Sequence, residues 1–210
     1  MIKVMIIDDH TLVREGLKKI LAEAQDITCQ GEAGDAREAL NIIKEKKIDV
    51  VLLDISMPGM NGLELLKRIR QSKPSLHILM LSMYPEEHYA IRAVKAGASG
   101  YLTKEMAAEE LISAIQLVSK GRKYITESLA EKMAFELGNG ASEKHHTRLS
   151  DREYQVLCEI ASGKTVSQIA KKTFLSVKTV STYRCRLLEK LQLDNNAQLT
   201  NYAFKENLIA

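Results

Sequence analysis

The sequence predicts an α/β domain, in which helices cover both faces of a parallel sheet, followed by a smaller all-α domain. Two observations indicate the first domain. Short apolar runs alternate with stretches of apolar residues at three- and four-residue spacing, and each run is followed by a polar or charged side chain. A third observation indicates the second domain, where helical patterns with serine caps follow a polar, glycine-containing segment. The 210 residues leave room for two separate cores.

Four segments are expected to form strands because they are short, apolar and rich in β-branched residues: 3–7, 49–53, 77–81 and 99–103. Between the first two of these segments, apolar residues recur at helical spacing. They are Leu12, Leu17, Ile20 and Leu21, then Ala36, Ala39, Leu40 and Ile43. Almost continuous apolar strands are typical of a parallel sheet buried on both faces. Ligands bind such sheets beyond the carboxyl ends of the strands, so the residues that end different strands become neighbours.

The side chains at these strand ends point to phosphoryl chemistry. They are Asp8, Asp9, Asp54, Ser82, Tyr101 and Lys104. Three carboxylates held close together repel one another, and a hard divalent cation such as Mg²⁺ relieves that repulsion. Asp54 is then the expected nucleophile, because an aspartate can take a phosphoryl group as an acyl phosphate. Asp8 and Asp9 are expected to hold the metal, and Lys104 to supply the opposing cation.

The segment after Asp54 predicts a tight loop, because Pro58, Gly59 and Gly62 lie just before a helix that begins near Leu63. The backbone carbonyl of Ser56 is a candidate third protein ligand of the metal. Ser82 is placed to bond a phosphoryl oxygen, although a serine at a strand end is also ordinary. Tyr101 can equally be a packing residue.

Residues from Lys3 to about Gly121 resemble the receiver of a bacterial two-component response regulator. The resemblance is carried by Ile6-Ile7-Asp8-Asp9-His10, by Leu53-Asp54-Ile55-Ser56-Met57-Pro58-Gly59, by Leu81-Ser82-Met83 and by Gly100-Tyr101-Leu102-Thr103-Lys104. It implies a flavodoxin-like fold of five parallel strands and five helices that takes phosphate from a histidine kinase. It also implies that Asp54 is the acceptor, that Asp8 and Asp9 form the Mg²⁺ site, that Lys104 contacts the phosphoryl group, and that Ser82 and Tyr101 are the paired switch residues.

The second domain opens with a capping box, in which Ser150 is followed three residues later by Glu153, and the helix is expected to stop at Gly163. A short helix is expected from 165 or 166 to about 173, and Ser176 is expected to cap a longer one over 177–191. The longer helix carries an apolar stripe at Val177, Val180, Leu187, Leu188 and Leu191. Between Lys164 and Arg186 there are six basic residues and no acidic one, a run that by itself is usually a solvated face.

Residues from about 148 to 208 resemble the LuxR/NarL (FixJ) type of helix-turn-helix domain, through Leu149-Ser150-Asp151-Arg152-Glu153 and Leu175-Ser176-Val177-Lys178-Thr179-Val180-Ser181-Thr182-Tyr183. The resemblance implies that the helix over 177–191 reads the major groove of double-stranded DNA. Base contacts are expected from Ser181, Thr182 and Cys185. Phosphate or nearby contacts are expected from Lys178, Thr179, Arg184 and Arg186. Tyr183 stands where this family often has histidine.

The expected organisation is a receiver over 1–122, a linker over 123–147 and a DNA-binding domain over 148–210. Apolar runs reach only about five residues, far short of a membrane span of about 20 residues, and the start has no signal-peptide pattern. The three cysteines are widely spaced, which indicates reduced thiols and a cytoplasmic protein. The adjacent histidines His145 and His146 in the linker are expected to be solvated.

These observations predict a transcription regulator, not an enzyme, that a histidine kinase phosphorylates on Asp54 and that binds promoter DNA. A homodimer is expected on phosphorylation, and RNA polymerase is a further expected partner. Two alternatives remain at this stage. One is a small phosphatase with an aspartyl-phosphate intermediate, which would need an acid or base close after the nucleophile, where Ser56 stands. The other is a receiver whose basic domain binds RNA or a protein, although aromatic residues make up only 5% of the chain.

Overall fold

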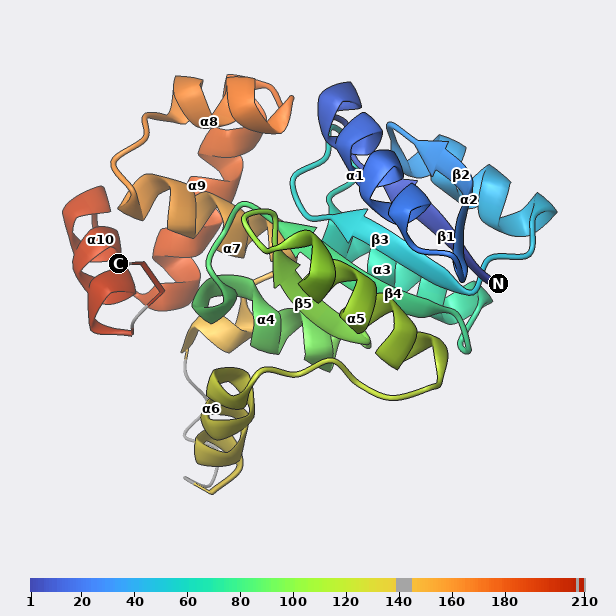
Figure 1. Cartoon of the computed structure of the whole chain (residues 1–210). Helices are drawn as coiled ribbons and strands as arrows, with labels where there is room; N and C mark the ends of the chain where they lie inside the picture. Colours follow the sequence, from blue (N-terminus) through green and yellow to red (C-terminus); the bar gives the residue numbers. More distant parts are fainter. Residues whose placement is uncertain (139–144, 207, 210) are drawn as a thin grey trace. The chain divides into compact units, whose positions relative to one another are not determined.

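The computed structural model describes residues 1–138, 145–206, 208 and 209 (Figure 1). The chain forms two compact units, Met1–Ala130 and Glu131–Ala210. The boundary between them falls inside helix α6, Glu127–Gly138. Part of the linker expected from the sequence, residues 139–144, lies outside the described residues.

The first unit is built on a five-stranded parallel sheet in the order β2-β1-β3-β4-β5. The strands are β1 (Ile2–Ile7), β2 (Ile27–Ala33), β3 (Val50–Asp54), β4 (His77–Ser82) and β5 (Gly100–Thr103). The predicted strands are thus confirmed within a residue at each end. The strand order reverses direction beside β1, and in doubly wound sheets the crevice at that point, outside the carboxyl ends of the strands, is where ligands bind.

Helices cover both faces of the sheet (Figure 1). Their bounds are α1 (Thr11–Glu23), α2 (Ala36–Glu45), α3 (Gly62–Ser72), α4 (Glu86–Lys95) and α5 (Ala108–Ser119). One core layer joins α1 and α5 to the sheet, with Leu21 and Ile115 against Val4, Ile6 and Leu52. Alternate strand residues such as Met5 and Ile7 are also fully or almost fully buried, because the sheet is covered on its other face as well.

The start of α3 is set by the cap residue Asn61 and by Gly62, which follows it. The side chain of Asn61 accepts a hydrogen bond from Glu64 N, and the Glu64 carboxylate accepts one from Asn61 N, which completes a capping box. Gly62 follows, and its amide donates to Ile55 O at 2.9 Å. A Cβ on Gly62 would lie 2.0 Å from Asp54 O, so the loop passes too close to the end of β3 for any side chain at this position.

The segment after α5 runs back along the edge of the sheet. Gly121 has a φ of 81°, which turns the chain, and Tyr124 then forms a parallel bridge with Gly100 of β5. Tyr124 N donates to Ser99 O at 2.8 Å. The beginning of the expected linker is therefore hydrogen-bonded to the receiver.

The second unit is all-α. Its elements are the 3₁₀ turn η1 (His145–Arg148), α7 (Asp151–Ala161), α8 (Val166–Thr173), α9 (Val177–Leu191) and α10 (Asn196–Lys205). The predicted capping box of Ser150 and Glu153 and the predicted cap Ser176 are confirmed. The core of the unit contains Leu157, Ile169, Val180, Leu187 and Leu199, all without exposed surface.

Two helices of this unit end in a left-handed residue that is not glycine. Phe174, with φ 55°, ends α8, and Gln192, with φ 56°, ends α9. Residues other than glycine adopt this conformation at a cost of about 1 kcal/mol.

His146 is not simply solvated as expected, because it is partly buried and both its backbone N and its Nδ1 lie about 3 Å from the hydroxyl oxygen of Tyr202. The thiols of Cys29, Cys158 and Cys185 are all free. Within the described part of the chain, no helix is both long enough and apolar enough to cross a membrane.

Candidate functional site

Three strand ends bring together the residues that we call the acidic cluster: Asp8, Asp9, Asp54 and Lys104. Asp8 and Asp9 follow β1, Asp54 is the last residue of β3, and Lys104 follows β5. Lys104 Nζ lies 2.6 Å from Asp8 Oδ2 and 3.1 Å from Asp54 Oδ2. Asp8 and Asp54 are 1% and 2% exposed, so both carboxylates are almost removed from water.

His10 belongs to the same group of side chains, although it was not among the site residues predicted from the sequence. Its Nδ1 lies 2.9 Å from Asp9 Oδ1 and 3.2 Å from Asp8 Oδ1. One potential ligand atom from each of Asp8, Asp9, His10 and Asp54 lies within 4.8 Å of the others, and it is the one such group in the described residues. The ring of His10 is 63% exposed, so it borders the site from the solvent side.

The acidic cluster holds more negative charge than one lysine can balance. The pKa of Asp54 is raised to about 6, chiefly by burial and also by the neighbouring Asp8, against the opposing effect of Lys104. Burial lowers the pKa of Lys104, but Asp54 and Asp8 outweigh that effect and the pKa is raised overall. Two buried oxygens, Asp9 Oδ1 and Asp54 Oδ2, accept no well-directed hydrogen bond despite the nearby His10 and Lys104 nitrogens.

The loop after Asp54 curves around this group as the glycines and proline predict. Ile55 N donates to Leu81 O of β4 at 3.3 Å, and Met57 N donates to Ile55 O at 3.2 Å. Ser56 is partly buried, and a backbone hydrogen bond from it lowers the pKa of Asp54. The structure therefore places Ser56 beside the Asp54 carboxylate.

Ser82 and Tyr101 are both buried and both bond to Tyr84. Tyr84 N donates to Ser82 Oγ at 3.0 Å, and the Tyr101 hydroxyl donates to Tyr84 O at 2.8 Å. The ring of Tyr84 also packs on Tyr89 of α4, with centroids 4.9 Å apart. Ser82 lies beside the acidic cluster, since Lys104 N donates to Ser82 O at 2.8 Å. Tyr84, which the sequence analysis did not select, thus connects the two expected switch residues through its backbone.

Helix α9 presents the side chains that were expected to contact DNA. Lys178, Thr182, Cys185 and Arg186 are exposed, Thr179, Ser181 and Arg184 are partly buried, and Val180, Leu187 and Leu191 on the other side are buried. Two of the expected contacts already have partners within the unit. Arg184 Nε donates to Asn196 Oδ1 of α10 at 2.5 Å, and the Thr182 hydroxyl donates to Lys178 O at 3.0 Å.

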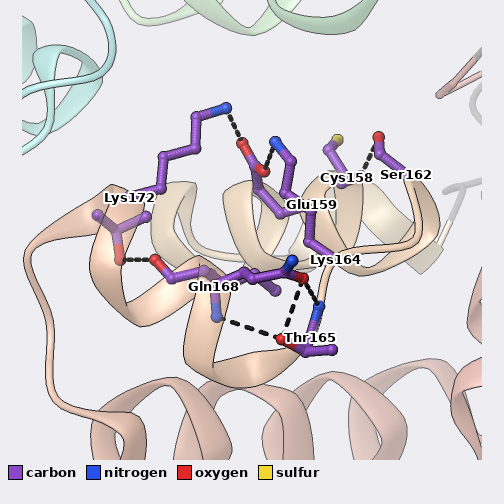
Figure 2. Close-up of polar contacts among 9 residues, drawn as sticks. Cys158, Glu159, Ser162, Lys164, Thr165, Gln168 and Lys172 are labelled. Carbon is purple, nitrogen blue, oxygen red and sulfur yellow. Dashed lines mark hydrogen bonds and ion pairs between the residues drawn. The ribbon is translucent and has the colours of Figure 1, made fainter.

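Two members of the basic run are neutralised by a residue outside it, in what we call the lysine cluster: Glu159, Lys164 and Lys172. Glu159 of α7 is 1% exposed, and Figure 2 shows both ammonium groups meeting its carboxylate. Lys164 Nζ bonds to Oε2, and Lys172 Nζ lies 2.6 Å from Oε1. The same view shows the capping box in which Thr165 and Gln168 bond to each other at the start of α8. Lys172 thereby joins α8 to α7, and Lys164 ties the turn between them to α7.

The fold and the acidic cluster define a receiver, and the second unit a helix-turn-helix domain. Residues 4–116 match the response regulator receiver domain family, and residues 147–203 match the LuxR family of bacterial regulatory proteins. The chain belongs to the response regulators of two-component systems that carry a LuxR-type DNA-binding domain.

Individual relatives match this chain over nearly their whole length. Response regulator UvrY of Escherichia coli is 37% identical over 99% of this chain and 96% of its own. Response regulator GacA of Pseudomonas aeruginosa is 36% identical over 100% and 98%. The structure of RcsB from Salmonella enterica serovar Typhimurium bound to promoter rprA in the presence of phosphomimetic BeF3⁻ is 28% identical, with a TM-score of 0.64 over 96% of this chain and 97% of that one.

Proposed function

We propose that a histidine kinase phosphorylates this regulator on Asp54 and that phosphorylation controls its binding to promoter DNA. The observation that carries the proposal is the acidic cluster. Its buried oxygens Asp9 Oδ1 and Asp54 Oδ2 accept no well-directed hydrogen bond, although His10 Nδ1 lies 2.9 Å from the first and Lys104 Nζ 3.1 Å from the second. Such oxygens are costly to bury unless a cation or a reacting group occupies the site. The proposed extents are 1–122 for the receiver, 123–147 for the linker and 148–210 for the DNA-binding domain.

The residues of the acidic cluster fit a Mg²⁺ ion. Oxygen ligands from one or two carboxylates are what this ion prefers, and Asp9 Oδ1 and Asp54 Oδ2 offer such oxygens. Asp8, Asp9, Asp54 and the carbonyl of Ser56 would hold it. When bound, the metal would neutralise charge on the phosphoryl group that is being transferred.

The chain's own side chains then have separate tasks. Asp54 is the nucleophile, and it must be ionised to attack, which a neighbouring cation favours by lowering its pKa from the raised value. Lys104, held 2.6 Å from Asp8, remains positively charged and contacts the phosphoryl oxygens. Ser82 is the hydroxyl that turns toward the phosphoryl group, and Tyr101 is its partner in the switch.

The DNA-binding part of the proposal is supported by exposure and by the promoter complex of RcsB. Ser181, Thr182 and Cys185 would meet base edges, whereas Lys178, Thr179 and Arg186 would meet phosphates. Arg184 bonds to Asn196 through Nε, so its terminal nitrogens would make the phosphate contact. Double-stranded promoter DNA, a homodimer of the phosphorylated chain, contact with RNA polymerase and location in the cytoplasm complete the proposal, which is regulatory and not enzymatic.

Labelling with acetyl phosphate tests the receiver part. The native chain should take up phosphate in the presence of Mg²⁺, and the chelator EDTA or Asp54→Asn should abolish the uptake, because the acyl phosphate needs a carboxylate. Asp35→Asn is the matched control, since Asp35 is an exposed cap of α2 and asparagine caps helices equally well. Full labelling of Asp54→Asn would contradict the assignment.

Salt titration of binding to cognate and scrambled duplexes tests the DNA part. Lys178→Ala or Arg186→Ala should weaken both kinds of binding and lower the slope of log affinity against log salt by about one unit. Thr182→Ala should instead change the preferred sequence by roughly 1–3 kcal/mol per lost base contact. Lys19→Ala, an exposed change in the receiver, is the control. If single-stranded RNA bound more tightly than duplex DNA, the alternative nucleic acid would replace this proposal.

A further inference from the structure

The segment that leaves the receiver is held against β5 and α5 by side-chain bonds as well as by its backbone. Lys123 Nζ donates to Ala98 O at 2.6 Å, just before β5. The hydroxyl of Tyr124 donates to Glu110 Oε1 of α5 at 2.6 Å. These contacts fix the path of the chain up to the first residue before α6.

That residue is Thr126, and its hydroxyl makes bonds in two directions. It donates to the carboxylate of Glu86, with distances of 2.7 Å to Oε1 and 2.8 Å to Oε2. It also accepts from Leu129 N at 3.2 Å, which is the bond of a helix cap, and Ala130 N donates to Thr126 O at 3.0 Å. One hydroxyl therefore joins the start of α4 to the start of α6.

Glu86 is the first residue of α4 and follows the loop that Ser82 holds. Only Met83, Tyr84 and Pro85 separate Ser82 from Glu86, and the Ser82 hydroxyl accepts from Tyr84 N inside that loop. Tyr84 O is in turn fixed by the Tyr101 hydroxyl. A short, bonded segment thus connects Ser82 to the carboxylate that Thr126 contacts.

We propose that the Thr126 hydroxyl and the Glu86 carboxylate form the joint through which the phosphorylation site acts on α6. This inference rests on the proposed phosphorylation of Asp54. When Ser82 turns toward a phosphoryl oxygen, its bond to Tyr84 N is disturbed and Glu86 shifts with the loop. Thr126 then loses its acceptor, the cap of α6 weakens, and the amides of the first turn open more often. Phosphorylation thereby selects a state in which the connection to the DNA-binding domain is loosened.

Variants of the full-length chain separate the joint from the cap. Glu86→Ala removes the acceptor but keeps the Thr126 hydroxyl, so the cap should be weakened and not lost, whereas Thr126→Val removes both bonds at almost unchanged volume. Glu86→Gln and Thr126→Ser keep an acceptor and a hydroxyl, so they are the matched conservative variants. Labelling of Asp54 by acetyl phosphate is measured for each, because it reports the proposed function independently of the joint.

The test is amide hydrogen exchange at Leu129 and Ala130, with and without beryllofluoride as the phosphoryl stand-in. In the native chain we expect exchange to rise several-fold on adding it. In Glu86→Ala exchange should already be raised and change no further, while Asp54 labelling stays native. Glu86→Gln and Thr126→Ser should behave as the native chain. A native response in Glu86→Ala, or no response at these amides in a native chain that labels fully, would overturn the joint. Absence of labelling in the native chain would instead contradict the proposed function.

Discussion

The acidic cluster of the receiver and the lysine cluster of the helical domain hold opposite imbalances of charge. In the first, three carboxylates share one lysine, the pKa of Asp54 is raised to about 6, and buried oxygens accept no hydrogen bond. In the second, one buried carboxylate is bonded at both oxygens by Lys164 and Lys172. The difference teaches that an unbalanced charge marks a chemical site when its buried oxygens lack well-directed hydrogen bonds. A satisfied imbalance stabilises the fold.

We expect the largest effect on stability when both lysines of the lysine cluster are replaced. Lys164→Ala combined with Lys172→Ala should lower the free energy of unfolding of the helical domain by about 3 kcal/mol, because the buried carboxylate of Glu159 loses both ammonium groups that bond to it. Denaturant unfolding followed by exchange of α7 amides measures it. Lys171→Ala combined with Lys178→Ala is the control, since both side chains are exposed. If the free energy of unfolding fell no more than in the control, the paired charges of the lysine cluster would not stabilise the fold.

We expect the next largest effect on stability when one negative charge is removed from the acidic cluster. With chelator present, Asp54→Asn should raise the free energy of unfolding of the receiver by about 2 kcal/mol at about pH 8. The folded pKa of Asp54, about 6, lies above its ordinary value of 3.8, so the folded state binds the proton more tightly and loses stability as the pH rises through about 6. The gain should therefore vanish below about pH 4. Calorimetry across this pH range, with Asp35→Asn as control, checks it, and a pH-independent difference would contradict it.

We expect a smaller effect from Mg²⁺, which should stabilise the domain that holds the acidic cluster and not the domain that holds the lysine cluster. At ten times its dissociation constant, the ion should stabilise the receiver by about 1.4 kcal/mol, because it binds only the folded site. The helical domain should not respond. Asp9→Asn should reduce the response of the receiver, and equal stabilisation of both domains would indicate non-specific binding.

The smallest expected effect is that of Glu159→Met. Replacing a buried ion pair by an apolar side chain of similar volume is often neutral, and here both lysines are partly exposed and can turn to water. The free energy of unfolding should change by less than about 1 kcal/mol, as measured by urea denaturation. A large loss would mean that the lysine cluster contributes more than its paired atoms suggest.

Most of the fold could be predicted because local patterns and tertiary structure agree. The apolar runs became β1, β3, β4 and β5, and the helix over 177–191 begins and ends where its cap and apolar stripe predicted. Strand β2 was not selected from its residues. It lies at the edge of the sheet and contains Gln30, Gly31 and Glu32, all only partly buried, so it lacks the continuous apolar run of a central strand.

The candidate site could be predicted as far as strand ends determine it. Asp8, Asp9, Asp54 and Lys104 meet because parallel strands end at one edge of a sheet. Tyr84 and Glu159 could not be predicted in the same way. Tyr84 acts through its backbone N and O, which carry no sequence signal, and Glu159 meets Lys172 only because α7 and α8 pack together.

The contact between Gly62 and Asp54 limits how this receiver can change over generations. Since a methyl group at position 62 would overlap the carbonyl of Asp54, even the smallest substitution must move the peptide that carries the acceptor. Gly62 therefore tolerates no substitution, although it takes no part in the chemistry. Variation that tunes phosphorylation has to enter elsewhere, at exposed borders of the site such as His10, where a new side chain changes access without displacing the acceptor.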